Sequence, residues 1–534
     1  MENAKSFILS TLTASILFSC ATFKVTNTPI KNLSTIASKQ VNLDDNEKNT
    51  WGHLDILIDS LPGMSVEKTY NEIIKDRKGK KIIVAVIDTG IDIDHEDLND
   101  VIWVNTKEIP GNYVDDDKNG YVDDVHGWNF LGDAYDEQLE YVRLIKSNVD
   151  FIGKEEAQAR FNEELTKAKQ NKTRYEGLLK QVEGAHKVLE TYFLMANYSE
   201  ADVNSLISKD TIVTQAAKFA KQIYGYGLES MTDAIKELQG GIDYFSDRIN
   251  INLNIDLNGR TTDDDPDNFS QISYGNSNVK HISKNETHGT HVAGIIAAER
   301  NNGLGVDGVA SNVQIMAIRA VPNGDEYDKD VALAIRYAAD NGAKVINTSF
   351  GKAYSPHSDK VRNAIAYASS KDVLIVNAAG NDAIDLDKNF SYPNDSLDNG
   401  PEVADNFITV GALSPSIGEE MIAIFSNYGK INVDVFAPGD KIYSTTPENT
   451  YDFKGGTSMA APAVAGVAAL IRSYFPKLSA SQVKSVIMVS GLPINGEVII
   501  GGKSDKKLSF DAISKSSRIV NAYNAFILAS RLNR

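Results

Sequence analysis

The chain has 534 residues, of which 42% are hydrophobic, and its formal net charge is -18. This length and apolar content are enough to bury one large core. The acidic balance argues against a nucleic acid as partner and predicts a soluble surface that repels anionic lipid headgroups.

The first twenty residues have the pattern of a processing segment. Lys5 precedes an apolar run, 7–18, that is too short to span a bilayer and is soon followed by Cys20. The segment resembles a bacterial lipoprotein signal, which implies removal of 1–19, lipidation of Cys20 and anchoring to a membrane of the cell envelope. A secretory peptide cut near Ala21 and an uncleaved anchor are the alternatives. Cys20 is the only cysteine in the sequence, so no disulfide can form within the chain.

The remainder divides into a tether and a large domain. Residues 20–50 are rich in Thr, Asn, Ser and Lys without apolar periodicity, which predicts a flexible tether. In 51–534, apolar runs alternate with helix-period segments, which predicts an α/β fold with a mostly parallel sheet and helices on both faces. The expected strands are 81–87, 313–320, 344–348, 372–378, 407–412 and 433–436, and the expected helices are 290–301, 329–341, 358–370 and 459–475.

An acidic loop at 115–124 carries carboxylate and amide oxygens at alternate positions around a glycine. Oxygen ligands at this spacing suit Ca²⁺. We therefore predict a structural calcium site formed by Asp115, Asp117, Asn119, the Tyr121 carbonyl and Asp123. The loop is not an EF-hand, because a histidine stands where that motif needs its bidentate glutamate. The alternative is a solvated Asn-Gly hairpin turn without metal.

Residues 133–250 interrupt the large domain with a strongly helical pattern. One face of the pattern is apolar, and Lys and Glu lie opposite. The apolar positions are Leu178, Val182, Ala185, Leu189, Tyr192 and Phe193. The pattern predicts a helical insertion.

Four polar residues stand in glycine-flanked motifs. Asp88 ends the apolar run 81–88, and His288 opens His-Gly-Thr-His-Val-Ala-Gly. Asn381 ends Ala-Ala-Gly-Asn, and Ser458 lies in Gly-Gly-Thr-Ser-Met-Ala-Ala-Pro, a turn that leads into a long apolar helix. A serine hydroxyl attacks only when a base takes its proton and a third group holds that base. Asp88, His288 and Ser458 supply these residue types.

In this order the motifs resemble those of the subtilisin (subtilase) family of serine endopeptidases. The resemblance implies that Asp88, His288 and Ser458 form a triad that hydrolyses peptide bonds through an acyl-enzyme. It also implies that the Asn381 side chain binds the oxyanion. Protein or peptide substrates are then the expected partners.

The resemblance also implies a substrate-binding site. Ser349, Phe350 and Gly351 are expected to line the S1 pocket and to pair with extended substrate backbone. Asp382 and Ser391 are expected at the far end of the pocket, where Asp382 would admit a basic P1 side chain.

Two further expectations concern the role of the insertion and a possible calcium ligand, Asp97. The insertion separates Asp88 from His288 by more than a compact member of the family requires. It is interpreted either as a helical hairpin packed on the catalytic domain or as an exosite or lid that gates large substrates. Asp97 aligns with a calcium-ligand aspartate of some family members.

The alternative function is a non-catalytic lipoprotein scaffold that binds a partner through the insertion. A scaffold has no physical need for all four polar groups, which favours the enzyme. The sequence indicates no oligomeric state.

Overall fold

The central strands form because their apolar runs are covered on both faces. In β1 (Ile82–Asp88), Val84 and Val86 enter one hydrophobic core, whereas Ala85 and Ile87 enter another. Successive side chains of a strand point to opposite faces of the sheet. The continuous apolar run therefore reflects a sheet buried on both sides.

The computed structural model describes residues 25–31, 43–283 and 285–533. The predicted signal segment, Cys20 and much of the predicted tether lie outside these residues. Within the described ranges, no helix combines the length and the apolar character that crossing a bilayer requires.

Nine strands form one sheet in the order β10-β13-β7-β6-β5-β4-β1-β3-β2. All neighbours in it are parallel except β10 and β13. Two antiparallel hairpins, β8–β9 and β11–β12, lie outside it. The remaining strands are β2 (Gly127–Asn129), β3 (Val313–Arg319), β4 (Val345–Thr348), β5 (Leu374–Ala378), β6 (Phe407–Leu413), β7 (Val435–Pro438), β8 (Ile442–Thr446), β9 (Thr450–Lys454), β10 (Leu492–Pro493), β11 (Glu497–Ile500), β12 (Lys503–Ser509) and β13 (Arg518–Ile519).

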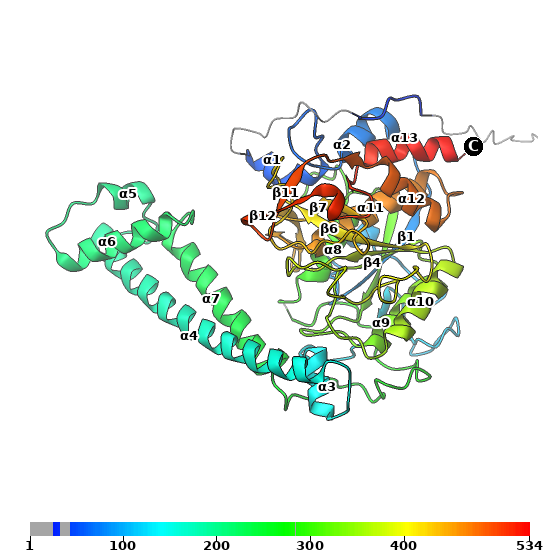
Figure 1. Cartoon of the computed structure of the whole chain (residues 1–534), viewed down its shortest axis with the longest axis horizontal. Coiled ribbons are helices and arrows are strands. Elements are labelled where there is room, and N and C mark those ends of the chain that lie inside the picture. Colours follow the sequence, from blue (N-terminus) through cyan, green and yellow to red (C-terminus); the bar gives the residue numbers. More distant parts are fainter. Residues whose placement is uncertain (1–24, 32–42, 284, 534) are drawn as a thin grey trace, which may run out of the picture.

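Helices cover both faces of this sheet (Figure 1). One core contains residues of α8, α11, α12 and α13, and the other contains residues of α9 and α10. The helices outside the insertion are α1 (Asp45–Thr50), α2 (Val66–Lys68), α8 (His288–Ala297), α9 (Asp328–Asp340), α10 (Ser358–Ser370), α11 (Thr457–Tyr474), α12 (Ala480–Ser490) and α13 (Ala522–Leu532). Short 3₁₀ helices are η1 (Trp51–His53), η3 (Asn99–Val101) and η5 (Phe510–Ala512), and η2 (Thr69–Ile74) and η4 (Arg248–Asn252) are π-helical. The predicted α/β fold is confirmed. Helix 358–370 has the predicted bounds, and each other strand and helix listed above from the sequence is present with at least one end shifted.

The segment 133–250 contains α3 (Glu140–Ser147), α4 (Lys154–Phe193), α5 (Glu200–Ser205), α6 (Thr211–Tyr224) and α7 (Met231–Asp247). Figure 1 shows α4 and α7 side by side, extending away from the main body with α5 and α6 at the far end. Val182 and Leu189 of the predicted apolar face are buried against residues of α6 and α7, and Tyr192 is exposed. The expected packing of the hairpin on the catalytic domain is therefore limited to its base, because the long helices bury their apolar faces against each other.

Candidate active site

The carboxyl ends of parallel strands place the predicted polar residues at one edge of the sheet. Asp88 is the last residue of β1, Ser349 follows β4, and Asn381 lies three residues beyond β5. These three strands are neighbours in the order β5-β4-β1. Residues far apart in the sequence therefore meet.

Asp88 and His288 are in direct contact. The Nδ1 atom of His288 lies 2.7 Å from Oδ1 of Asp88, and the same oxygen accepts a hydrogen bond from the Thr89 amide at 2.8 Å. The Asp88 side chain is 1% exposed and the His288 side chain 33% exposed. A buried carboxylate on Nδ1 fixes the ring orientation and leaves Nε2 to act as a base.

A glycine after the histidine makes this contact possible. His288 is the first residue of α8, and Gly289 lies against the chain that follows Asp88. A Cβ at Gly289 would come within 2.3 Å of the Gly90 carbonyl oxygen and 3.2 Å of the Asp88 carboxylate. Any larger residue would push the helix start away from the carboxylate.

The nucleophile candidate, Ser458, sits in the first turn of α11 and is linked reciprocally to Ser349. Its hydroxyl donates to the Ser349 carbonyl at 2.9 Å, and the Ser349 hydroxyl donates to the Ser458 carbonyl at 2.8 Å. The Ser458 carbonyl has no helix hydrogen bond because the residue four positions later, Pro462, has no amide hydrogen to donate. Pro462 is inside the helix rather than at its first position, and Ser349 replaces the missing bond.

The structure contains no hydrogen bond between Ser458 and His288 in the described part of the chain. Ser458 Oγ is instead engaged by the Ser349 carbonyl. A reaction at Ser458 Oγ would require this hydroxyl to leave the Ser349 carbonyl. Catalytic hydrogen bonds of this kind are often formed only when substrate is bound.

Asn381 is oriented by its neighbour on the nucleophile turn. Its Oδ1 atom accepts from the Thr457 amide at 2.8 Å and from the Thr457 hydroxyl at 3.0 Å. The Gly380 amide donates in turn to the Thr457 hydroxyl at 2.9 Å. The Asn381 Nδ2 group and the Ser458 amide nitrogen both lie near Gly456, at 3.4 Å and 3.6 Å from the position that a Cβ on this glycine would take.

The predicted substrate-binding residues lie on two facing segments. Ser349 is buried, Phe350 is half-buried, and Gly351 is exposed. A Cβ on Gly351 would lie 3.2 Å from the Ser391 hydroxyl, so the two segments are in contact. Asp382 is exposed.

A small cavity borders this region, and Asp395 rather than Asp382 is among its lining residues. Ala378, Ala379 and Ser391 also line it. Burial raises the pKa of Asp395 to about 7, and the nearby Glu402 adds to this effect. Sequence patterns did not reveal Asp395, because no glycine or histidine motif surrounds it.

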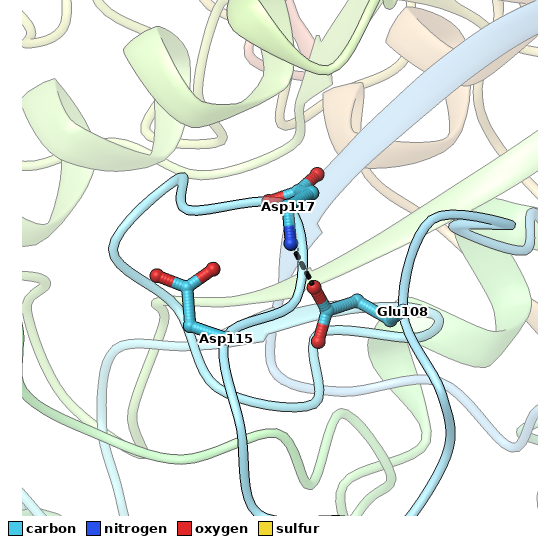
Figure 2. Close-up of side chains that lie close together, drawn as sticks. All are labelled: Glu108, Asp115 and Asp117. Carbon is cyan, nitrogen blue, oxygen red and sulfur yellow. Dashed lines mark hydrogen bonds between the residues drawn. The ribbon is translucent and has the colours of Figure 1, made fainter.

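The acidic loop brings together part of the predicted calcium site. Figure 2 shows Asp115 and Asp117 beside Glu108, and ligand oxygens of the three lie within 4.8 Å of one another. Glu108 also accepts from the Asp117 amide at 3.0 Å. Glu108 was not predicted because it precedes the alternating pattern. The only sequence feature that could have suggested Glu108 as a ligand is that its carboxylate lies a few residues before the acidic loop.

The side chains of the other residues predicted at this site make the following contacts. The Asp123 carboxylate accepts from the amides of Gly111 and Tyr113, each at 2.9 Å, and is not part of the three-carboxylate group. The Asn119 side chain donates to Asp124, and the Tyr121 ring is packed in an aromatic cluster.

Asp97 is placed in a different loop contact. It accepts from the Asn302 side chain at 2.7 Å and from the Val306 amide at 3.1 Å. Burial raises the pKa of Asp97.

Comparison with known proteins shows which family and which relatives this chain resembles. The model of the subtilase family matches residues 79–508. A thermophilic serine proteinase of Bacillus sp. (strain AK1) is 46% identical to the chain over 187 residues, which are 35% of this chain and 42% of that protein. Thermitase of Thermoactinomyces vulgaris is 40% identical over 210 residues, which are 39% of this chain and 68% of that protein.

A solved structure of a protease from Pseudoalteromonas arctica PAMC 21717 shares 32% sequence identity, with 45% of this chain and 70% of that chain covered and a TM-score of 0.36. The match to the Bacillus sp. (strain AK1) proteinase spans less than half of that relative's length. The family model spans most of this chain and includes all four polar motifs. The chain belongs to the subtilase family.

Proposed function

We propose that this protein is a serine endopeptidase that hydrolyses peptide bonds in proteins. The observation that carries the proposal is the 2.7 Å contact between His288 Nδ1 and the buried Asp88 carboxylate, at the sheet edge that also holds Ser458. A buried carboxylate beside an imidazole is the arrangement that makes a nearby serine reactive.

The proposed reaction begins with rotation of Ser458 toward His288. Nε2 takes the hydroxyl proton as Oγ attacks the scissile carbonyl, and Asp88 stabilises the imidazolium. The Ser458 amide and the Asn381 Nδ2 group bind the oxyanion. His288 then gives the proton to the leaving amine, which forms the acyl-enzyme. Water, activated by the same base, releases the acid and regenerates Ser458.

Substrate binding is proposed along Ser349, Phe350 and Gly351, which follow β4 and would pair with extended peptide backbone. We propose that Asp382 favours a basic P1 residue. Equal cleavage rates for peptides that differ only in Lys, Leu or Glu at P1 would refute this preference.

Calcium binding belongs to the proposal as a structural feature. Glu108, Asp115 and Asp117 supply hard oxygen ligands, and the burial of Glu108 makes a compensating cation favourable. Lys107, which forms an ion pair with Asp117 at 3.6 Å, is 73% exposed, so it does not fill the group. The three carboxylates would hold the ion and rigidify the loop.

We further propose export as a lipoprotein through the segment that ends at Cys20. The support is the sequence pattern of a basic residue, an apolar run and one cysteine. Metabolic labelling with an alkyne fatty acid, compared between the wild type and Cys20→Ala, tests this step. Equal labelling of the two proteins would refute lipidation at Cys20.

A fluorophosphonate probe tests the catalytic proposal. We expect labelling of the wild type at Ser458, none in Ser458→Ala, and strongly reduced labelling in His288→Ala, because the probe requires an activated hydroxyl. A folded wild-type protein that neither labels nor cleaves casein would instead support the scaffold function.

A further inference from the structure

Lys352 directly follows the proposed substrate-binding residues and ties together the two segments around them. Its amide donates to the Tyr392 carbonyl, and the Tyr392 amide donates to the Lys352 carbonyl, each at 2.9 Å. Tyr392 adjoins Ser391, which lies against Gly351. The Lys352 backbone therefore fixes the position of both segments.

The Lys352 side chain points into the protein and meets the helical insertion. Its ammonium group lies 2.7 Å from Oε2 of Glu140, at the start of α3, and 2.9 Å from Asp328 of α9. It also donates to the Glu326 carbonyl at 2.7 Å. The Lys352 side chain is 2% exposed and the Glu140 side chain 7% exposed. A buried ion pair thus connects the insertion to the substrate-binding segment.

A second cation fixes Glu140 to the main domain. Arg143 lies 2.5 Å from Glu140 Oε2 and donates to the carbonyls of Asp325 at 2.7 Å and Glu326 at 3.2 Å. Its guanidinium stacks 4.0 Å from the ring centroid of Tyr327. The Glu140 amide donates to Asp325 Oδ2 at 2.8 Å. These contacts leave α3 little freedom to move relative to residues 325–327.

The charges in this cluster are strongly coupled. Burial works against ionisation, but Lys352 and Arg143 lower the pKa of Glu140 to about 2. Burial likewise opposes the charge of Lys352, yet Glu140 and Asp328 raise its pKa above the ordinary value. Separating such partners leaves an uncompensated buried charge, which is strongly unfavourable. A shift of α3, which carries Glu140, is therefore expected to displace Lys352 as well.

We propose that Glu140 is a positioning residue for substrate binding. Through Lys352 it holds the backbone of 349–351 in the conformation that pairs with an extended peptide. The base of the insertion therefore contributes to substrate binding. This inference rests on the proposed peptidase function of the same site. Neither Glu140 nor Lys352 contacts the residues proposed to carry out the chemistry.

The test compares two substrates and one probe in the full-length protein. A hexapeptide amide requires extended backbone pairing, a single-residue ester requires little of it, and the fluorophosphonate probe requires only an activated Ser458. For Glu140→Gln we expect the KM of the hexapeptide to rise about tenfold, with kcat, ester hydrolysis and probe labelling near wild type. The exposed pair on α4, Glu163 and Lys167, provides the matched control Glu163→Gln, for which we expect no change.

The double variant Glu140→Gln with Lys352→Met separates positioning from stability. It removes both charges, so it avoids an unpaired lysine in the interior. A positioning role predicts that its hexapeptide KM stays raised even where thermal stability is recovered. Glu140→Asp keeps the charge with a shorter reach and is expected to be intermediate, and it replaces Glu140→Gln if that variant does not fold.

Two results would overturn the inference. One is a hexapeptide KM within twofold of wild type in the folded variants. The other is an equal loss for ester and hexapeptide, which would indicate a general effect on the site. Failure of the peptidase proposal would be distinct, since the wild type itself would neither label nor cleave.

Discussion

Arg319 and Glu286 form a fully buried ion pair that links the two chain segments carrying Asp88 and His288. Arg319 Nη2 lies 2.6 Å from Glu286 Oε1, and the two side chains are 0% and 1% exposed. Arg319 Nε also donates to the Thr89 carbonyl at 2.7 Å. Thr89 follows Asp88, and Glu286 precedes His288 by two residues, so one guanidinium holds both partners of the 2.7 Å contact in register.

This relationship predicts that Arg319→Lys lowers kcat more than it raises KM. Lysine keeps the positive charge but lacks the planar fork that reaches Thr89 and Glu286 together. We expect kcat to fall about tenfold, because misplacement of the imidazole weakens proton transfer. Kinetics on a peptide substrate, with the exposed Arg174→Lys as control, provide the measurement. An unchanged kcat in folded Arg319→Lys would contradict the role of this pair.

A second prediction concerns Asn381 and the residue that orients it. Asn381→Ala is expected to slow turnover roughly a hundredfold or more with KM nearly unchanged, because an oxyanion donor acts mainly in the transition state. Thr457→Val removes the hydroxyl that donates to Asn381 Oδ1 and is expected to give a smaller loss in the same direction. Steady-state kinetics of both variants check this order. A larger effect of Thr457→Val would assign the main role to Thr457 instead.

The sequence was sufficient for the sheet because buried parallel strands and their helices leave strong periodic patterns. It also placed Asp88, His288, Ser458 and Asn381 at strand ends and helix starts. The structure brings Asp88 and His288 into contact and places the other two at the same edge of the sheet. These residues were found through glycine-flanked motifs, in which backbone approach restricts the residue type.

The contacts that hold this edge together could not be predicted in the same way. Arg319 and Glu286 are separated in sequence and carry no motif, and Glu140 reads as an ordinary charged residue of a solvated helix. Their partners are set by tertiary packing between distant segments. The reciprocal Ser349 and Ser458 contacts depend on a carbonyl freed by a proline, which local patterns do not indicate.

The third prediction is a pH dependence of stability due to Glu326. Burial raises the pKa of Glu326 from 4.5 to about 8, with Lys352 acting in the opposite direction and Asp325 adding to the rise. The folded state therefore keeps a proton that the unfolded state releases above about pH 4.5. This stabilisation is fully present below pH 4.5 and is lost as the pH rises through 8. The expected slope is roughly 1 kcal/mol per pH unit between these values.

Urea unfolding of the wild type and Glu326→Gln between pH 5 and 9 provides the measurement. Glutamine cannot ionise, so we expect the stability of Glu326→Gln relative to the wild type to increase with pH. If the free energy of unfolding changes with pH in the same way for the two proteins, Glu326 has the same proton affinity in the folded and unfolded states. The exposed Glu163→Gln is the control, since removing a surface carboxylate should leave the curve unchanged.

The fourth prediction concerns the acidic loop. If Glu108, Asp115 and Asp117 hold calcium, chelation with EGTA is expected to lower the Tm by several degrees, and added Ca²⁺ should restore it. Glu108→Gln should remove most of this response by reducing the charge of the ligand group. Asp123→Asn is the comparison variant, because Asp123 accepts backbone hydrogen bonds outside the group. A response lost in Asp123→Asn but retained in Glu108→Gln would favour the ligands expected from the sequence alone.

The last prediction addresses the far part of the insertion. Figure 1 shows α4 and α7 leading away from the main body, which favours an exosite over a lid. Near the far end, Leu194 is 90% exposed and Ile207 is 91% exposed. An exosite at this end would contact a protein substrate through these exposed apolar side chains. We therefore expect removal of 182–235, with a short Gly-Ser connection between α4 and α7, to slow cleavage of a folded protein substrate severalfold.

The same deletion should leave small-peptide kinetics unchanged, because it spares the base of the insertion. The residues packed there, including Tyr141, Ala157, Ala168 and Leu253, form a separate hydrophobic cluster from the one that the deletion removes. Leu194→Ser with Ile207→Ser tests the surface without shortening the helices. Faster cleavage of folded proteins after deletion would identify a lid, since a barrier would have been removed. If both variants cleave folded proteins and small peptides at wild-type rates, the far part of the insertion is neither a lid nor an exosite. The base would then be the functional part of the insertion.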